Sequence, residues 1–264
     1  TEIVGLVPKK ALIDAGKHFL RKQHRSVGIS ESDTIRIAVR SMGLDELKPF
    51  IPEEKIVEYM VSETNTKKLV DMTCSAFAEE TASESPAPGG GSISAYMGAL
   101  GAALGTMVAN LSSHKAGWDE RWEEFSDYAE RGQALMAELL HLVDEDTEAF
   151  NRIMAVFAMP KATDEEKAAR SAALQSATLY ATQVPLKTMK AALRVFEIVK
   201  AMADIGNPNS VSDAGVGALA ARSAVLGAQL NVKINAAGLK DRATADALTA
   251  EAEQIAAEAI ALEA

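Results

Sequence analysis

Apolar residues recur at every third or fourth position over most of the chain beyond Leu69, which is the spacing of helices with a buried face. The pattern breaks near Pro160 and again around Gly206, where prolines and small polar residues mark loops. It predicts helices at about 66–83, 90–113, 118–157, 164–203, 211–238 and 243–262. Long helices joined by short connections predict a mainly all-α fold, an up-and-down helix bundle.

The first sixty residues follow a different pattern. Apolar residues alternate over Thr1–Pro8, which predicts a short strand, and helices are expected at Lys9–Gln23 and Ser32–Met42, the second ending at Gly43. One strand and two short helices bury too little apolar surface to form a domain alone, so this region is expected to be a small α/β remnant of a larger domain. We therefore expect the chain to be a piece of a longer protein. Its expected parts are the C-terminal tail of that larger domain at 1–60, a linker at 61–68 and a helical domain at 69–264.

The loop Pro86–Ser92 has the sequence PAPGGGS and leads into the helix expected at 90–113. Consecutive glycines let the backbone approach another group closely, and a helix N-terminus offers free N–H groups to an anionic or polar ligand. The candidate ligand contacts are Pro88, Gly89, Gly90, Gly91 and Ser92. The alternative is a loop that leads into a tightly packed core helix and binds nothing, although the many small residues of that helix favour a ligand site.

An acidic segment lies within the helix expected at 118–157. Counting by threes and fours along its apolar stripe passes through Asp146, which places this carboxylate on the face that packs inward. Asp144, Glu145 and Glu148 fall off the stripe and are expected on a solvated face. A buried carboxylate suits acid–base catalysis, but it is also typical of an acid that pairs with a lysine or caps a neighbouring helix. Asp144 is the second choice, because a one-residue error in helical phase exchanges neighbours.

Polar residues in three later segments are further candidates. Lys187 follows Pro185, a proline that is expected to kink or interrupt its helix, and it is either a cationic partner in the site or a solvated surface lysine. Asn231 and Asn235 share one helical face, so both amides are able to face one ligand. The candidate ligand contacts at the loop and start of the helix near position 210 are Asn207, Ser212 and Asp213.

Composition and charge narrow the class of protein. The formal net charge of −10 argues against nucleic acid and anionic membranes as partners. One cysteine excludes a disulfide within the chain, and the four histidines show no metal-ligand spacing, so no metal is expected. The uncharged run at 85–113 is long enough to span a membrane, but its glycines, serines and prolines favour a buried helix of a cytoplasmic protein.

The segment PAPGGGS followed by an Ala/Gly-rich helix resembles the cyclodeaminase family of folate enzymes, whose relatives include methenyltetrahydrofolate cyclohydrolases. Further segments agree in order and approximate spacing, so that the resemblance runs from about Leu69 to the C-terminus. They are LVDEDTEAF at 142–150, VPLK at 184–187, Gly206-Asn207 with Ser212-Asp213, and NVKIN at 231–235. The first sixty residues resemble the tail of the transferase half of formimidoyltransferase-cyclodeaminase.

The resemblance implies a formimidoyltetrahydrofolate cyclodeaminase that closes the ring of 5-formimidoyltetrahydrofolate and releases ammonia, a step of histidine degradation and one-carbon metabolism. It implies that Asp146 carries the proton, with Asp144 as the second choice, and that Lys187 orients Asp146 or meets the glutamate tail of the folate. The tetrahydrofolate derivative, with or without a polyglutamate tail, is substrate rather than cofactor, and no transferase activity is expected.

Two other functions stay open, a methenyltetrahydrofolate cyclohydrolase and a non-catalytic helical oligomerisation module. Neither the N-terminal region nor the helix expected at 90–113, with its many small residues, is expected to hide its apolar surface in one copy. We therefore expect a homodimer or a ring of dimers.

Overall fold

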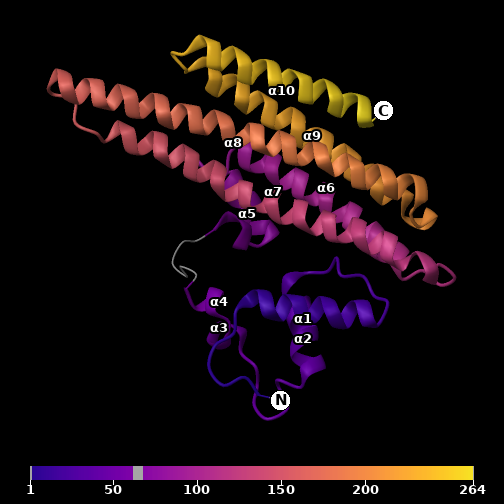
Figure 1. Cartoon of the computed structure of the whole chain (residues 1–264). Helices are drawn as coiled ribbons and strands as arrows, with labels where there is room; N and C mark the ends of the chain where they lie inside the picture. Colours follow the sequence, from indigo (N-terminus) through magenta and orange to yellow (C-terminus); the bar gives the residue numbers. More distant parts are fainter. Residues whose placement is uncertain (1, 62–67, 264) are drawn as a thin grey trace.

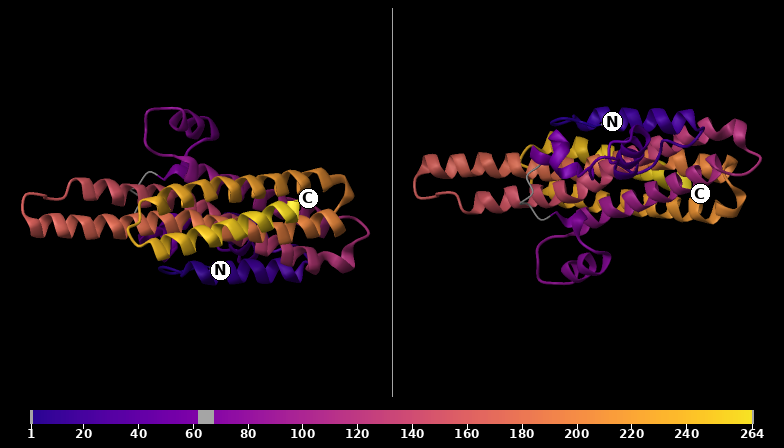
Figure 2. Two further views of the ribbon diagram at one scale, coloured as in Figure 1. Left: turned by 90° about the horizontal axis from the view of Figure 1, so that it is seen from above. Right: turned by 90° about the horizontal axis from the view of Figure 1, so that it is seen from below.

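The computed structural model describes residues 2–61 and 68–263, and its larger part is a bundle of long antiparallel helices (Figure 1). These helices are α6 (Gly90–Ser113), α7 (Trp122–Phe157), α8 (Asp164–Ile205), α9 (Val211–Ala237) and α10 (Arg242–Glu263). Each packs against the helix that follows it, and α7 and α8 project beyond the others as a hairpin (Figure 2). The predicted up-and-down bundle is confirmed, and residues 68–263 contain no strand.

The helix expected at 66–83 is shorter and broken. A 3₁₀ turn, η1 (Leu69–Asp71), is followed by α5 (Cys74–Thr81), and residues 66 and 67 lie outside the described residues. The break has a local cause, because the Thr73 side chain accepts a hydrogen bond from the Ala76 N–H and so begins a new helix. At the start of α8 the same device is more complete, since Thr163 and Glu166 form a capping box.

Helix α6 lies inside the bundle, where it packs against α7, α8 and α9. Its glycines permit this close packing. A Cβ added at Gly101 would lie 2.8 Å from the Gly217 carbonyl of α9, and one at Gly105 would lie 3.0 Å from Ile198 of α8. Among the described residues, α6 is the helix that is long and apolar enough to cross a membrane, yet 61% of its most apolar stretch is buried inside the molecule. Such burial is expected of a core helix.

Pro185 lies in the middle of α8 and is buried, and α8 continues through it from Asp164 to Ile205. Of the kink or interruption expected at Pro185, the interruption is therefore wrong. Packing explains the difference, because the neighbouring residues Val184, Leu186 and Met189 belong to the main hydrophobic core and hold the helix on both sides of the proline.

The N-terminal region forms α1 (Lys9–Lys22), α2 (Glu31–Met42), α3 (Pro52–Lys55) and α4 (Val57–Val61) around a small core of its own. The two predicted helices are confirmed, and Gly43 ends α2 with a positive φ of 64°. The strand expected over Thr1–Pro8 is reduced to one parallel bridge between Val7 and Ile56, since residues 2–61 offer it no further strand to pair with. The linker predicted at 61–68 falls mostly on residues 62–67, outside the described residues.

The N-terminal region packs on the bundle through the turn that joins α1 to α2, which lies on the side of α1 nearer the bundle (Figure 1). The Val27 N–H donates to Ser126 Oγ of α7 at 3.0 Å, and Asn110 Nδ2 of α6 donates to the Gly28 carbonyl at 2.8 Å. Gly28 is required there, because an added Cβ would lie 2.3 Å from Ala129. This turn therefore fixes the N-terminal region against α6 and α7.

Candidate active site

The glycine loop forms the N-terminus of α6. Gly89 occupies the N-cap position in an extended conformation and, having no side chain, leaves the first N–H groups of the helix without a cap from its own residue. Pro88 is buried, Gly90 is exposed and Ser92 is fully buried. The N-terminus of α6 is thus open on one side and covered on the other, and the missing cap comes from another helix.

Asp146 of α7 supplies this cap. Its Oδ2 accepts a hydrogen bond from Ser92 Oγ at 2.9 Å, and the Ser92 backbone N–H also donates to the carboxylate. A Cβ added at Gly91 would lie only 2.1 Å from Asp146 Oδ1. The glycine is therefore what allows the carboxylate to reach the helix end. Of the two roles expected for a buried acid, capping of a neighbouring helix is present, and it places the carboxylate beside the glycine loop.

Burial is the dominant influence on Asp146 and raises the pKa of its carboxyl group above the usual value of 3.8. The two hydrogen bonds from Ser92 oppose this rise but do not cancel it. No Lys, Arg or His among residues 2–61 and 68–263 forms an ion pair with Asp146. A carboxyl group with a raised pKa and no cation is better suited than an ordinary carboxylate to accept and return a proton.

A cavity of about 140 Å³ lies against this carboxylate. Both asparagines of α9 reach it, since a Cβ at Gly90 would lie 3.4 Å from Asn231 Nδ2, and Asn235 donates to the Ala181 carbonyl of α8. Thr147 Oγ1 is buried there and has no hydrogen-bond partner among the described residues. The lining residues are Pro86, Ala87, Gly89, Gly90, Gly91, Asp146, Thr147, Ala149, Phe150, Ile153, Ala181, Asn231 and Asn235. Four helices and the glycine loop therefore form one small cavity with a polar and an apolar side.

The expectation that Glu145 lies on a solvated face is wrong. Its side chain is 10% exposed, because Tyr180 and Lys187 of α8 cover it. Lys187 Nζ donates to Glu145 Oε1 at 2.6 Å and Tyr180 OH donates to the same oxygen at 2.9 Å, so the pKa of Glu145 lies below its usual value although burial opposes this. Lys187 therefore pairs with Glu145 rather than with Asp146 in this structure.

Asp144 has a structural partner of its own. Its Oδ1 accepts from the Leu69 backbone N–H at 2.7 Å and so ties η1 to α7, while burial raises the pKa of its carboxyl group. It does not line the cavity that holds Asp146. Glu148, by contrast, is exposed as expected and pairs with Arg152.

Three of the predicted contacts lie at the opposite end of α6. The Asn207 N–H donates to Ser112 Oγ at 2.8 Å, and Ser112 is 22 residues from Gly90, about 33 Å along a helix. Ser212 and Asp213 lie in the first turn of α9 at this same end. A single copy of the chain does not bring these three residues to the glycine loop, since the antiparallel packing of α6 and α9 separates them.

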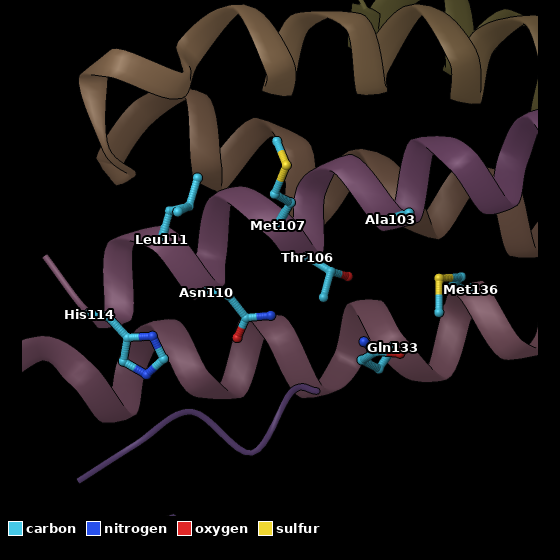
Figure 3. A pocket seen from close by; sticks show the side chains of 8 residues that line it. All are labelled: Ala103, Thr106, Met107, Asn110, Leu111, His114, Gln133 and Met136. Carbon is cyan, nitrogen blue, oxygen red and sulfur yellow. The ribbon is translucent and has the colours of Figure 1, made fainter. Parts of the chain in front are cut away.

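Larger cavities are present in the described part of the chain, but Asp146 does not line them. A groove of about 470 Å³ lies between α6 and α7, where Thr106, Asn110 and His114 project toward Gln133 and Met136 (Figure 3). His114 Nε2 accepts from the Ser26 N–H at 3.3 Å, so this groove adjoins the packed N-terminal turn. It has no carboxylate in its lining, nor any of the predicted site residues. No group of three or more His, Cys, Asp or Glu side chains in the described ranges is placed to hold a metal ion.

Sequence reasoning missed Tyr180, Thr147 and Ala181. Thr147 is next to Asp146, but its hydroxyl becomes notable only when the surrounding helices leave it unpartnered. Ala181 had a readable signal, because a proline four residues later removes the N–H that its carbonyl would accept from in a helix. Tyr180 had none.

Comparisons with known proteins find matches over most of the chain. The family described as Formiminotransferase-cyclodeaminase matches residues 73–254, and the family described as Formiminotransferase domain matches residues 1–62. The formimidoyltransferase-cyclodeaminase of Rattus norvegicus is 37% identical over 91% of this chain, and the chain spans 44% of that protein. The methenyltetrahydrofolate cyclohydrolase of Methylorubrum extorquens is 42% identical over 72% of this chain and 91% of its own length.

A solved structure extends the likeness to three dimensions. The formiminotetrahydrofolate cyclodeaminase from Thermotoga maritima has a TM-score of 0.64 and 26% sequence identity, over 73% of this chain and 92% of its own. The match to the Formiminotransferase-cyclodeaminase family covers more than half of the chain and includes every residue that lines the cavity. The chain therefore belongs to the formiminotransferase-cyclodeaminase family.

Proposed function

We propose that this chain is a formimidoyltetrahydrofolate cyclodeaminase, which converts 5-formimidoyltetrahydrofolate to 5,10-methenyltetrahydrofolate and ammonia. One observation carries the proposal. Asp146 has a raised pKa and no cationic partner among the described residues, and it lines a cavity together with the glycine loop and two amides. The family supports the reaction class, and the chain spans about half the length of the curated relatives that join a cyclodeaminase to a transferase.

The chemistry requires one proton to move from one nitrogen to another. N10 attacks the carbon of the protonated formimidoyl group, which forms the new C–N bond of the five-membered ring. Asp146 accepts the proton of N10 and returns it to the former formimidoyl nitrogen. That nitrogen, with the two protons it already carried, leaves as ammonia when its C–N bond breaks, and the methenyl cation remains. A single carboxyl group whose pKa is raised toward neutrality can perform both transfers.

Surrounding groups have supporting roles in this proposal. Ser92 holds the carboxylate in place beside Gly91, with its hydroxyl group bonded to Oδ2 and its backbone N–H also donating to the carboxylate. The apolar side of the cavity, formed by Phe150 and Ile153, suits the flat pterin ring. Lys187 is bonded to Glu145 and is therefore proposed to act on the site only through that neighbour of Asp146.

A direct assay tests the proposal. The purified chain is mixed with 5-formimidoyltetrahydrofolate, and methenyl absorbance and ammonia are followed together. Equal amounts of both products support a cyclodeaminase, and the Asp146→Asn variant serves as the control. Absence of both products with a correctly folded chain would overturn the proposal.

The second candidate is a methenyltetrahydrofolate cyclohydrolase, favoured by the 42% identity to the Methylorubrum extorquens enzyme. The match of residues 1–62 to the transferase domain favours the cyclodeaminase, because that domain accompanies the cyclodeaminase in the rat relative. Supplying 5,10-methenyltetrahydrofolate and following loss of its absorbance separates the two. The non-catalytic module requires an enclosed Asp146 with no cavity at the glycine loop, whereas the cavity is lined by both.

We also propose that the chain assembles as a homodimer or a ring of dimers. Large apolar side chains of α6 and α9 face outward, among them Leu111, Leu230 and Ile234, of which Ile234 is 73% exposed. A second copy that covers these helices would remove this apolar surface from water. Light scattering at micromolar concentration tests assembly, and a monomer would contradict it.

A further inference from the structure

Pro185 leaves one backbone carbonyl of α8 without its usual partner. In an α-helix the carbonyl of residue 181 accepts from the N–H of residue 185, and proline has no N–H. The structure supplies another donor, because Asn235 Nδ2 of α9 donates to the Ala181 carbonyl at 2.7 Å. Ala181 is largely buried, so this bond satisfies a group that would otherwise be costly to bury.

This bond also decides which way the Asn235 amide faces. A carbonyl oxygen only accepts, so the Asn235 atom directed at Ala181 must be the NH₂ group, and Oδ1 occupies the other position. Asn231 behaves similarly, since its Nδ2 donates to the Gly227 carbonyl of its own helix at 3.0 Å. Within residues 2–61 and 68–263 neither Oδ1 receives a hydrogen bond, and both side chains line the cavity beside Asp146.

Apart from the backbone N–H groups of the glycine loop, the polar side of the cavity therefore offers mainly hydrogen-bond acceptors. They are the carboxylate of Asp146 and the two amide oxygens, and the unpartnered Thr147 hydroxyl is able to accept as well. Such a set is complementary to a ligand rich in N–H groups, as an amidine or an aminopyrimidinone ring is. It disfavours a ligand that presents a carbonyl oxygen in the same place, because two acceptors would then meet.

We propose that Pro185 is a positioning residue for substrate recognition. By freeing the Ala181 carbonyl it fixes the Asn235 amide, whose Oδ1 then accepts a hydrogen bond from an N–H group of the ligand in the cavity. The identity of the ligand rests on the proposed function, whereas the orientation of the amide rests on the contacts alone. The two parts are therefore tested separately.

A double-mutant cycle on stability tests the orientation. Asn235→Ala deprives the Ala181 carbonyl of its donor and is expected to lower Tm by several degrees. In the Pro185→Ala background residue 185 regains an N–H, so the same substitution is expected to lower Tm much less. Asn231→Ala is the matched control, with an equal effect in both backgrounds because the Gly227 carbonyl does not depend on residue 185. Equal effects of Asn235→Ala in both backgrounds would overturn the proposed orientation.

Kinetics with 5-formimidoyltetrahydrofolate test the recognition. Pro185→Ala lets the amide turn, so KM is expected to rise about fivefold to tenfold while kcat changes much less. Asn235→Ala, with Pro185 intact, is expected to raise KM by a similar factor. A structural defect alone would lower the fraction of active protein and leave KM unchanged, and an unchanged KM in both variants would overturn the proposal.

Inhibition by 5-formyltetrahydrofolate, which carries C=O where the substrate carries C=NH, locates the contact. If Oδ1 meets the formimidoyl N–H, Pro185→Ala binds this inhibitor more tightly than the wild type does. If Oδ1 meets the pterin ring, inhibitor binding weakens in parallel with KM; either result supports the proposal. A wild-type chain that releases no ammonia would instead overturn the proposed function, and the stability cycle would still decide the orientation.

Discussion

Two neighbouring acidic residues on different faces of α7 have different partners and opposite pKa shifts. On the face toward α8, Glu145 is covered by Tyr180 and bonded to Lys187, and its pKa lies below the usual value. On the face toward α6, Asp146 meets a serine and a glycine loop, forms no ion pair among the described residues, and has a raised pKa. Successive residues of a helix point about 100° apart, so one step along the chain exchanges one environment for the other.

The difference separates a structural acid from a reactive one. A carboxylate that is paired with a cation stays ionised and holds its neighbours in place. A carboxylate that is held only by hydrogen bonds, and is partly removed from water, has a raised pKa and remains able to exchange a proton. Burial alone does not distinguish the two, since both are shielded from solvent.

The largest effect is expected from Asp146→Asn. The amide keeps the size of the side chain and can still accept from Ser92, but it cannot carry a proton. Turnover measured by ammonia release should fall by about 100- to 10,000-fold, while the thermal melt changes little. Asp144→Asn is the control, because that carboxylate is bonded to Leu69 outside the cavity, and it should change turnover far less. A near-normal rate for the Asp146 variant would show that another group moves the proton.

The same variant has a pH signature. Because burial raises the pKa of Asp146, its carboxyl binds protons more tightly in the folded than in the unfolded chain. The stabilisation that the protonated Asp146 carboxyl gives to the folded state is therefore fully present below pH 3.8, and it is lost as pH rises through the raised pKa. Urea titrations from pH 4 to 8 should show wild-type stability falling relative to Asp146→Asn over this range. A constant difference between the two would contradict an elevated pKa.

A smaller effect on turnover is expected from Gly91→Ala. The added Cβ would lie 2.1 Å from Asp146 Oδ1, so the carboxylate must move by about 1 Å, and a displacement of that size costs about 100-fold in rate. Gly215→Ala is the matched control, since that glycine is exposed on α9 with no atom within 4 Å of an added Cβ. It should leave the rate unchanged and stabilise the helix slightly. Equal rates for the two variants would show that the approach of Asp146 to Gly91 is not needed.

Lys187→Met tests the other face of α7. It leaves Glu145 without its cation, and it is expected to lower the free energy of unfolding by about 1–2 kcal/mol at neutral pH, a modest figure because Lys187 is 52% exposed. The lowered pKa of Glu145 means that this stabilisation is present above the ordinary value of 4.5 and is lost as pH falls through the folded value. Denaturation at pH 7 and pH 3 should therefore show a difference at pH 7 that shrinks at pH 3. Turnover should fall much less than in Asp146→Asn, and a loss as large would place Lys187 in the proton transfer.

The smallest effect is expected from Asp213→Asn. Its place at the far end of the bundle puts it about 33 Å of helix away from the glycine loop, so kcat/KM should be nearly unchanged. Ammonia release at several substrate concentrations measures this. A large rise in KM would mean that the corresponding end of a second copy reaches the cavity.

Much of the bundle follows from local sequence signals, because helix ends depend on nearby residues such as Thr163, Glu166 and the glycines before Ser92. The inward position of Asp146 followed from helical period alone. The burial of Glu145 did not, because Tyr180 and Lys187 come from another helix whose rotation no local pattern fixes. The distance of Asp213 from the glycine loop likewise depends on the direction in which α9 runs along α6.

The docked turn at Val27 and Gly28 has a practical consequence for dissecting the molecule. It covers polar atoms of the bundle, namely Ser126 Oγ and Asn110 Nδ2, and its backbone forms hydrogen bonds with both. A bundle expressed from residue 68 onward would expose these atoms to water, which hydrates them at little cost, and would keep its apolar interior closed. Residues 2–61 expressed alone would lose more of their stabilising contacts. Lys17 would lose its partner Glu130, His24 would lose the stacked Trp122, and only a small core would remain. The bundle is thus the part of this chain that we expect to fold when expressed alone.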